Sequence, residues 1–386
     1  MATKDAAPLP TLETYDVLAP IARGGMAEVF LGRAREGLGL VALKIMRADL
    51  SRNQEFVSMF VDEARIASRL DHPNIVKNRG AFSEAGRHFL VMDLVRGRTL
   101  LDVVDMALRR KKHLPYAMVA WVGARIADAL HYAHELEDGA GRPLEVIHRD
   151  VSPSNILVTF GGEPKLIDFG LAKAKDRITS TAHGVLKGKL AYVAPEQVNG
   201  APYDRRADVF ALGITLWEVS IGDRLFRAET DVETVRKVSR ADVPDPRTIR
   251  EDFPAPLAAI LLRALARDPA ERYATAGELA AALDAFVNEA DPSMGPEAVA
   301  AFVAPLYPDE SRAPWERTTD GESRAVTSPG GALPTWRASL DVALGERIAA
   351  LPANEAVARA RALLERALVE EWLGEPERAE KLARVG

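Results

Sequence analysis

The stretch "VIHRDVSPSNILVTFGGEPKLIDFG", residues 146–170, decides the fold. Asp150 and Asn155 are five positions apart on a predicted loop, and Asp168 follows thirteen residues after Asn155. This spacing lets Asp150 orient and deprotonate a hydroxyl group while Asn155 and Asp168 bind a metal ion, and Gly170 lets the chain turn. The spacing is far more specific than any single residue in it, and it indicates phosphoryl-transfer chemistry.

Upstream residues add a phosphate-binding pattern. The stretch "IARGGMAEVFLG", residues 21–32, lies between two predicted strands, where backbone N–H groups of a glycine-rich turn can cover phosphates. Taken alone, this stretch is better explained as an ordinary hairpin turn. The stretch "VALK" places Lys44 at the end of the next strand, and Glu63 follows on an amphipathic helix. A Lys44–Glu63 ion pair would aim the lysine at nucleotide phosphates, although Glu63 alone also fits an ordinary solvated helix charge.

The pattern of apolar residues divides the chain into regions. Residues 1–14 form an N-terminal extension, 15–95 predict a small antiparallel sheet with one helix, and 96–290 predict an α-rich lobe. Residues 291–345 predict a linker with a short helix, because the stretch 308–335 within them is polar and rich in Pro, Gly, Ser and Thr. Residues 346–386 predict a helical C-terminal segment, for which a single helical repeat is an alternative.

Composition excludes several functional classes. The 386 residues include no cysteine, so disulfides, thiol catalysis and cysteine-based zinc sites are excluded, and a reducing cytoplasmic location is expected. The net charge is −6, of which residues 291–386 supply −5 through 11 Lys and Arg against 16 Asp and Glu. Since the rest is close to neutral, we expect no nucleic-acid partner. The longest apolar run is short and interrupted by Glu218, so we expect no membrane span.

Further motifs follow in order: "APE" at 194–196, "DVFALG" at 208–213 and "DPAERY" at 268–273. With these, residues 15–288 resemble the eukaryotic-like protein kinases, and the runs "GGMAEV" and "AYVAPEQ" resemble their bacterial Ser/Thr branch. The resemblance implies an α+β, bilobal protein-kinase-like fold, with a small antiparallel β-sheet N-lobe and a larger α-rich C-lobe. A helical C-terminal tail follows. It also implies transfer of a phosphoryl group from ATP, with Mg²⁺, to Ser or Thr of protein substrates.

The resemblance assigns roles to named residues. It implies "MDLV", residues 92–95, as the hinge, with Met92 as gatekeeper and the backbone of Asp93 and Val95 on adenine. Apolar walls of the adenine site would come from Ala42, Val29 and Leu157. It further implies that Asp208 braces the catalytic loop and that Arg272 pairs with Glu196.

The sequence departs from the family pattern at three places. The glycine-rich turn reads Ala22, Gly24 and Ala27 where glycines are usual, although Gly25 restores flexibility, so we expect weaker or slower ATP handling. Ser152 replaces the lysine usual two residues after the loop aspartate, which removes a positive charge. Lys189 replaces the usual threonine before "APE". We expect Lys189 to supply the charge that Ser152 lacks; the alternative is a surface lysine.

The sequence also indicates a site of regulation and leaves two rival functions open. Arg149 is of the kind that pairs with a phosphate there, and Thr179, Ser180 or Thr181 is an expected autophosphorylation site. A Ser/Thr cluster in a polar loop also occurs without modification. Ala22, Ala27 and Ser152 keep open a pseudokinase that binds partners without catalysis. A small-molecule kinase of related fold is a third alternative.

Overall fold

The computed structural model describes residues 9–35, 39–84, 86–169 and 190–308. Contacts along the chain divide them into two compact units. The described residues before Gln54, together with Arg79–Arg96, form a β-unit, and Gln54–Asn78 with Gly97–Leu306 form a helical unit. In the described ranges, no helix combines the length and the apolar sequence that crossing a membrane requires.

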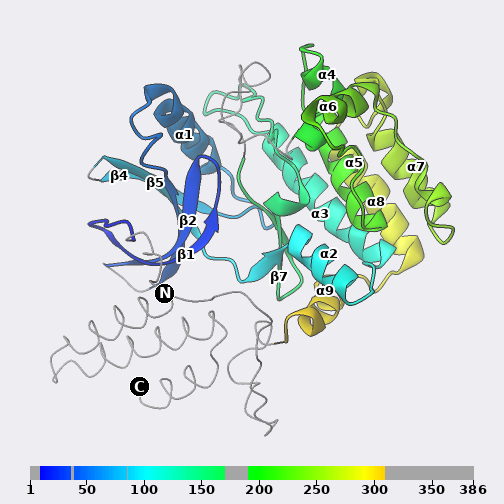
Figure 1. Cartoon of the computed structure of the whole chain (residues 1–386), viewed down its shortest axis with the longest axis horizontal. Coiled ribbons are helices and arrows are strands. Elements are labelled where there is room, and N and C mark those ends of the chain that lie inside the picture. The colour runs from blue at the N-terminus through cyan, green and yellow to red at the C-terminus, as the bar shows by residue number, and fades with distance from the viewer. Residues whose placement is uncertain (1–8, 36–38, 85, 170–189, 309–386) are drawn as a thin grey trace, which may run out of the picture. The chain divides into compact units, whose positions relative to one another are not determined.

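The β-unit is one five-stranded sheet with the strand order β1-β2-β3-β5-β4, whose ribbons are blue to cyan in Figure 1. The strands are β1 (Tyr15–Arg23), β2 (Ala27–Ala34), β3 (Leu40–Met46), β4 (Asn78–Glu84) and β5 (Arg87–Asp93). β1, β2, β3 and β5 pair antiparallel. Their runs of β-branched and aromatic residues favour this pairing.

Alternate residues of β3 face opposite sides of the sheet. Val41, Leu43 and Ile45 join a core that also takes in Phe89 and, from the N-terminal extension, Leu12. Because side chains alternate along a strand, Ala42 and Lys44 lie on the other face. One face of the sheet is therefore an apolar core, and the other carries the residues predicted to bind nucleotide.

The helical unit is built around a buried central helix. Its helices are α1 (Gln54–Ala67), α2 (Leu100–Arg109), α3 (Tyr116–His134), α4 (Pro195–Val198), α5 (Arg206–Ile221), α6 (Asp231–Arg240), α7 (Ala255–Ala264), α8 (Ala276–Ala290) and α9 (Pro296–Val303). From Ala207 to Ile221 every residue of α5 is buried, as expected for a helix that is apolar on all sides. α3 packs on α5 and α8, and α7 packs on α5 and α8 (Figure 1).

A second, small sheet completes the helical unit. Its strands β6 (Gly97–Thr99), β7 (Ile156–Thr159) and β8 (Pro164–Leu166) pair antiparallel in that order. Short 3₁₀ helices connect longer elements: η1 (Pro153–Asn155), η4 (Leu190–Tyr192), η5 (Pro246–Thr248), η6 (Pro269–Glu271) and η7 (Ala304–Leu306). The β7–β8 hairpin joins the predicted catalytic loop to Asp168.

The predicted α+β architecture, with a small antiparallel sheet and a larger helical part, is confirmed. Helix α1 groups by its contacts with the helical unit. The helical C-terminal segment expected at 346–386 lies outside the described residues and stays a prediction.

Candidate active site

The predicted catalytic loop folds around Asp150. Asn155 Nδ2 donates to the Asp150 carboxylate at 2.9 Å and to its backbone carbonyl at 2.8 Å. The Asn155 N–H donates to the Ser152 carbonyl at 2.9 Å, which closes the turn. Both Asp150 and Asn155 are buried. The five-residue spacing thus turns the Asn155 amide nitrogen toward Asp150, and Asn155 Oδ1 is the atom left to act as a metal ligand.

Asp208, near the start of α5, holds the backbone of this loop. It accepts a hydrogen bond from His148 N–H at 2.7 Å and from Arg149 N–H at 2.8 Å. His134, the last residue of α3, donates from Nε2 at 2.8 Å. Burial opposes the charged form, but the hydrogen bond from His134 and the other donors keep the pKa of Asp208 below its ordinary value. Asp208 therefore makes the bracing contacts that the family resemblance implied.

His148 links the loop to Asp168. The Asp150 N–H donates to His148 Nδ1 at 3.2 Å, so this nitrogen is the acceptor and the proton is on Nε2. His148 Nε2 in turn donates to the Ile167 carbonyl at 3.1 Å. Complete burial lowers the pKa of His148, although Asp208 and Asp150 oppose this, so the ring is held neutral. One neutral tautomer thereby joins the loop aspartate to the residue before Asp168.

The backbone at Asp168 is in an unusual conformation. Its φ is 56°, in the left-handed region that non-glycine residues seldom adopt. Ile167, the preceding residue, donates its N–H to the Asn155 carbonyl at 3.0 Å. Phe169, the following residue, packs its ring on His148 with centroids 4.6 Å apart. Partners on both sides hold Asp168 in a conformation that is strained by itself.

The donor set fits Mg²⁺. Magnesium bound together with nucleotide phosphates takes one or two protein oxygen ligands and keeps the rest of its shell in phosphate and water. Asn155 Oδ1 and the Asp168 carboxylate are ligands of this type, and the Ile167–Asn155 hydrogen bond ties their backbones together. Among the described residues, no three His, Asp or Glu side chains gather as a metal cluster, which a site of this sparse kind does not need.

Ser152 is buried in the loop, with 4% of its surface exposed. Its Oγ lies 2.9 Å from Ser154 Oγ, so the two hydroxyls share a hydrogen bond. A lysine at position 152 would place a long, positively charged side chain where this structure has a small, buried hydroxyl. Lys189, which we expect to carry the compensating charge, lies outside the described residues.

In the β-unit, strand pairing places Lys44 in line with other residues that were predicted to bind the nucleotide. Ala22 pairs with Val29, Val29 with Lys44, and Lys44 with Leu90. Directly opposed residues of antiparallel strands point to the same face. Ala22, Val29 and Lys44 thus form a row across the sheet, on the face opposite the apolar core.

A second row contains the predicted adenine residues. Ala42 pairs with Met92 across β3 and β5, and Val41 pairs with Asp93. The Asp93 carboxylate accepts a hydrogen bond from Arg79 Nε at 2.6 Å. Val95 follows β5, in the stretch that leads out of the β-unit. The sheet register therefore places Ala42 and Met92 next to the row that contains Lys44.

The glycine-bearing turn closes β1 onto β2. Gly24 N–H donates to the Ala27 carbonyl at 2.9 Å, and Arg47 N–H donates to the Met26 carbonyl at 3.1 Å. Ala27 is buried, with 5% of its surface exposed. Because Gly25 and Gly24 adopt no left-handed φ, the turn does not require glycine for its backbone angles. The alanine at position 27, where a glycine is usual, therefore fits in the turn as a buried side chain.

Other predicted site residues lie in different units. Glu63 is buried on α1 in the helical unit, with 7% exposed, so the solvated-charge alternative is wrong. Leu157 lies on β7 of the same unit, opposite Thr99 and Lys165. Lys44 belongs to the β-unit, so the Lys44–Glu63 ion pair stays a prediction. Thr179, Ser180 and Thr181 lie outside the described residues.

A family model described as the protein kinase domain matches residues 15–282. The chain belongs to the protein kinase family. The matched range contains the predicted catalytic loop, Asp168 and the motifs at 194–196, 208–213 and 268–273. The resemblance seen in the sequence is thereby confirmed.

Related proteins place this kinase in the bacterial branch. Tyrosine-protein kinase MasK of Myxococcus xanthus is 39% identical over 312 residues, which cover 79% of this chain and 48% of MasK. Serine/threonine-protein kinase PrkC of Bacillus subtilis is 34% identical over 269 residues, covering 69% of this chain and 39% of PrkC. The chain thus matches about half or less of the length of these curated relatives. The solved PknI kinase domain of Mycobacterium tuberculosis has a TM-score of 0.55 at 30% identity, covering 72% of this chain and 97% of that domain.

The kinase domain contains the buried ion pair expected between Glu196 and Arg272. Arg272 Nη1 and Nη2 donate to the two Glu196 oxygens at 2.7 and 2.8 Å. Arg272 also donates to the carbonyls of Ala266, Arg206 and Arg267. A bidentate pair with this many additional hydrogen bonds is geometrically specific. It ties α4 to the residues that precede α8.

A second buried cluster was not predicted. Tyr192 OH donates to Glu218 Oε2 at 2.5 Å, Arg224 Nη1 donates to the same oxygen at 2.9 Å, and Leu225 N–H donates to Oε1 at 3.0 Å. Burial and the adjacent Glu218 raise the pKa of Tyr192. The cluster fastens η4, directly before "APE", to α5. Tyr192 lies 26 positions before Glu218, and only the unusual Glu218 inside an apolar run signalled a buried partner.

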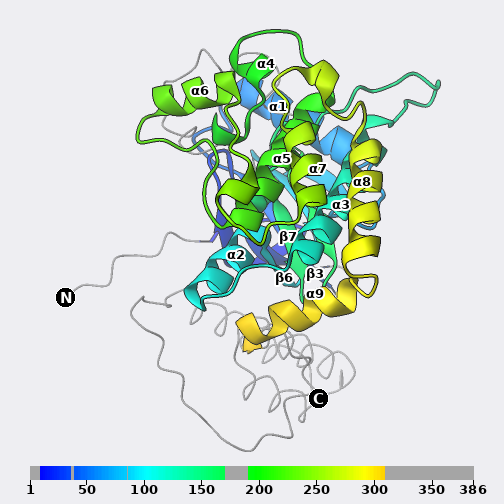
Figure 2. The same ribbon diagram turned by 90° about the vertical axis from the view of Figure 1, so that its right-hand side faces the viewer.

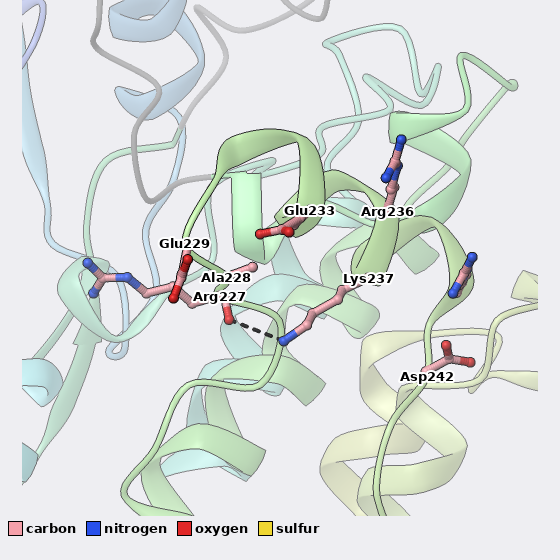
Figure 3. Close-up of a pocket in the computed structure, with 8 residues that line it drawn as sticks. Arg227, Ala228, Glu229, Glu233, Arg236, Lys237 and Asp242 are labelled. Carbon is pink, nitrogen blue, oxygen red and sulfur yellow. Dashed lines mark hydrogen bonds between the residues drawn. The ribbon is translucent and has the colours of Figure 1, made fainter.

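A surface hollow of about 870 Å³ lies beside α6 (Figure 3). It is lined by both acidic and basic residues: Arg227, Ala228, Glu229, Glu233, Arg236, Lys237, Arg240 and Asp242. Lys237 Nζ donates to the Arg227 carbonyl at 3.4 Å. None of the predicted site residues lines this hollow, and its mixed charges favour no particular ligand. It therefore adds nothing to the candidate active site.

Proposed function

We propose that this chain transfers the γ-phosphoryl group of ATP, with Mg²⁺, to Ser or Thr hydroxyls of proteins. The observation that supports this most strongly is the network joining Asp150, Asn155, His148 and Ile167. It holds the Asp150 carboxylate and Asn155 in a buried, hydrogen-bonded loop and joins that loop to the residue before Asp168. Phosphoryl transfer depends mainly on such positioning and on electrostatic stabilisation.

In this proposal each polar residue has one task. Asp150 accepts the proton of the incoming hydroxyl and holds that group in line with the phosphorus. Lys44, aligned by Glu63, binds the α- and β-phosphates. Asn155 and Asp168 hold Mg²⁺, which neutralises the charge that develops on the phosphate oxygens. Adenine binds between Val29, Ala42 and Leu157, with the hinge at Met92, Asp93 and Val95.

The choice of Ser or Thr as acceptor rests on family likeness. PrkC is named a serine/threonine kinase, whereas MasK is named a tyrosine kinase. Ser152 removes the local lysine that marks Ser/Thr kinases, so the loop itself does not decide. ATP as the donor and a sequence without cysteine both favour a cytoplasmic place of action.

The decisive experiment measures phosphoryl transfer from Mg·ATP to a generic protein substrate by wild type, Asp150→Asn and Asp168→Asn. We expect each variant to lose at least about 100-fold in kcat, because one removes the general base and the other a metal ligand. Asp71→Asn, which alters a carboxylate that is 78% exposed, is the control and should keep full activity. Phosphoamino-acid analysis of the product then identifies the acceptor.

Two results would contradict the proposal. Wild-type transfer no higher than that of Asp168→Asn would favour the pseudokinase. Phosphate found only on tyrosine would support kinase activity but would show that the proposed Ser or Thr acceptor is wrong.

We also propose that Lys189 replaces the lysine missing at Ser152. Lys189→Ala should lower kcat by roughly 10²–10³, because the variant lacks the positive charge that would stabilise the phosphoryl group during transfer. Lys187→Ala, two residues earlier in the same segment, is the matched control and should change kcat little. Equal rates for both variants would make Lys189 a surface residue. Autophosphorylation at Thr179, Ser180 or Thr181 is part of this proposal and is read by mass spectrometry of active enzyme.

A further inference from the structure

The folded chain continues beyond the part that matches the family. The match ends at residue 282, but α8 runs to Ala290 and is followed by a turn, α9 and η7. In the turn, Asp291 Oδ1 accepts hydrogen bonds from Ser293 N–H at 3.1 Å and Ser293 Oγ at 2.6 Å. Val299 and Val303 are fully buried, and Leu306 is 2% exposed. We call residues 291–306 the clasp, since they pack along the helical unit.

The first anchor of the clasp is the turn between β7 and β8. Gly162, in that turn, has a φ of 90°, and a Cβ atom there would lie 1.8 Å from the Pro296 carbonyl oxygen. Backbone thus packs directly on backbone, and any other residue at 162 would force the hairpin and α9 apart. Gly161, one residue earlier, has room: its nearest neighbour to a Cβ would be Thr159 Oγ1 at 3.7 Å.

The second anchor is Arg110, the C-cap residue of α2. Its guanidinium donates from Nη2 to the Leu306 carbonyl at 3.0 Å and from Nη1 to the Pro305 carbonyl. The last carbonyls of a helix have no partners within it, and they carry partial negative charge. The Arg110 guanidinium binds two such carbonyls and therefore attaches the end of the clasp to α2. Figure 2 shows α9 (yellow) running below α2 and the small sheet.

The elements held by the clasp lead into the candidate active site. β7 begins directly after Asn155, and β8 ends at Leu166, two residues before Asp168. β6, which pairs with β7, leads into α2. The two proposed Mg²⁺ ligands therefore lie at the two ends of the hairpin that contacts Pro296.

We propose that the clasp positions the β7–β8 hairpin, and through it Asn155 and Asp168, with Gly162 and Arg110 as positioning residues. Mg²⁺ requires near-octahedral geometry with short bonds, so a small shift of the hairpin weakens metal binding before it unfolds the protein. This inference rests on the proposed function only for its kinetic consequences. The structural part stands on the contacts of Gly162 and Arg110.

The test compares Gly162→Ala and Arg110→Met with the matched controls Gly161→Ala and Arg109→Met in the full chain. Arg109 is an exposed basic residue in the last turn of α2, so its variant also removes a charge from that helix end. Hydrogen exchange of amides 156–167 reports on the hairpin, and exchange across α5 reports on the fold as a whole. The Mg²⁺ concentration that gives half-maximal transfer reports on the site.

We expect faster exchange at 156–167 in Gly162→Ala and Arg110→Met, with α5 unchanged, and wild-type exchange in both controls. The half-maximal Mg²⁺ concentration should rise about threefold to tenfold, less than the ~100-fold cost of misplacing a reacting group by 1 Å. The KM for the protein substrate should not change. If Gly162→Ala fails to fold, Arg110→Met alone decides.

Hairpin exchange equal to that of the controls would overturn the inference. So would exchange that rises equally in α5, because that result means general destabilisation. If the wild type transfers no phosphate, the proposed function fails, but the exchange data still decide whether the clasp holds the hairpin.

Discussion

The carboxylate of Asp208 accepts three buried hydrogen bonds, two from the loop backbone and one from His134. A buried carboxylate is tolerated only when donors replace the water it has lost. Here the donors are also the residues that need positioning, since His148 and Arg149 directly precede Asp150. The same hydrogen bonds therefore compensate the buried charge of Asp208 and fix the conformation of the loop.

His134 supplies a donor whose loss can be measured. His134→Phe keeps an aromatic ring but removes the Nε2 donor, so we expect the free energy of unfolding to fall by about 1–3 kcal/mol. His134→Gln, whose amide can still donate, should recover part of the loss. Urea denaturation gives the stabilities, and kcat shows whether the loop has moved.

His131→Phe is the control for this prediction. It lies one turn earlier on α3, its side chain is 37% exposed, and its contact with Glu135 is long, at 3.9 Å. A loss as large in His131→Phe as in His134→Phe would mean that helix packing, and not the bond to Asp208, is responsible.

The role of His134 could not be predicted from the sequence. The stretch "HYAH", residues 131–134, does not match a metal-binding motif, and nothing in it distinguishes His134 from an ordinary helix histidine such as His131. A hydrogen bond to Asp208 crosses 74 positions of sequence, and no local pattern reports such a partner. Asp150, Asn155 and Asp168 could be predicted because their spacing is itself the signal.

Among the elements, periodicity predicted the long helices well. The region 96–290, predicted to be rich in helices, contains α3, α7 and α8, whose apolar residues recur at helical spacing. β6, β7 and β8 were not predicted, because strands of three or four residues are too short to show alternation, and Pro164 begins β8. α6 was missed because it is mostly polar and buries only Thr234 and Val238.

The Glu196–Arg272 pair makes a prediction about how elements are joined. Arg272→Met leaves the Glu196 carboxylate buried without its partner, so we expect a loss of about 3–5 kcal/mol in the free energy of unfolding. The double variant Glu196→Leu with Arg272→Met should lose less than Arg272→Met alone, because no charge is then left uncompensated. Urea denaturation of the variants tests both statements.

Arg247→Met provides the comparison for that prediction. Arg247 pairs with Asp245 at 2.6 Å on the surface, where water screens the charges and contributes its own hydrogen bonds. Its unfolding midpoint should equal that of the wild type. If the double variant of the buried pair were as unstable as Arg272→Met, the loss would come from packing around Phe210, which lies 4.6 Å below the Arg272 guanidinium.

For the whole molecule, the order of motifs predicted the fold. The order of the motifs from residue 21 to 273 resembles that of the protein kinases, and the family match confirms the fold that this resemblance implied. The clasp was not predicted as part of the folded helical unit, because it begins the range 291–345, which was interpreted as a linker with no more than a short helix. Only the packing of Val299 and Val303 reveals it.

The N-terminal extension has a practical consequence for anyone who shortens this protein. Glu84, on the edge strand β4, accepts hydrogen bonds from Glu13 N–H at 2.5 Å and from the Thr14 N–H and hydroxyl, and Leu12 lies in the core of the sheet. Cutting at residue 15, where the family match begins, would remove the donors to the Glu84 carboxylate and expose the apolar core residues that pack against Leu12. Exposed edges next to apolar surface invite aggregation, so a soluble catalytic fragment should begin no later than Leu9.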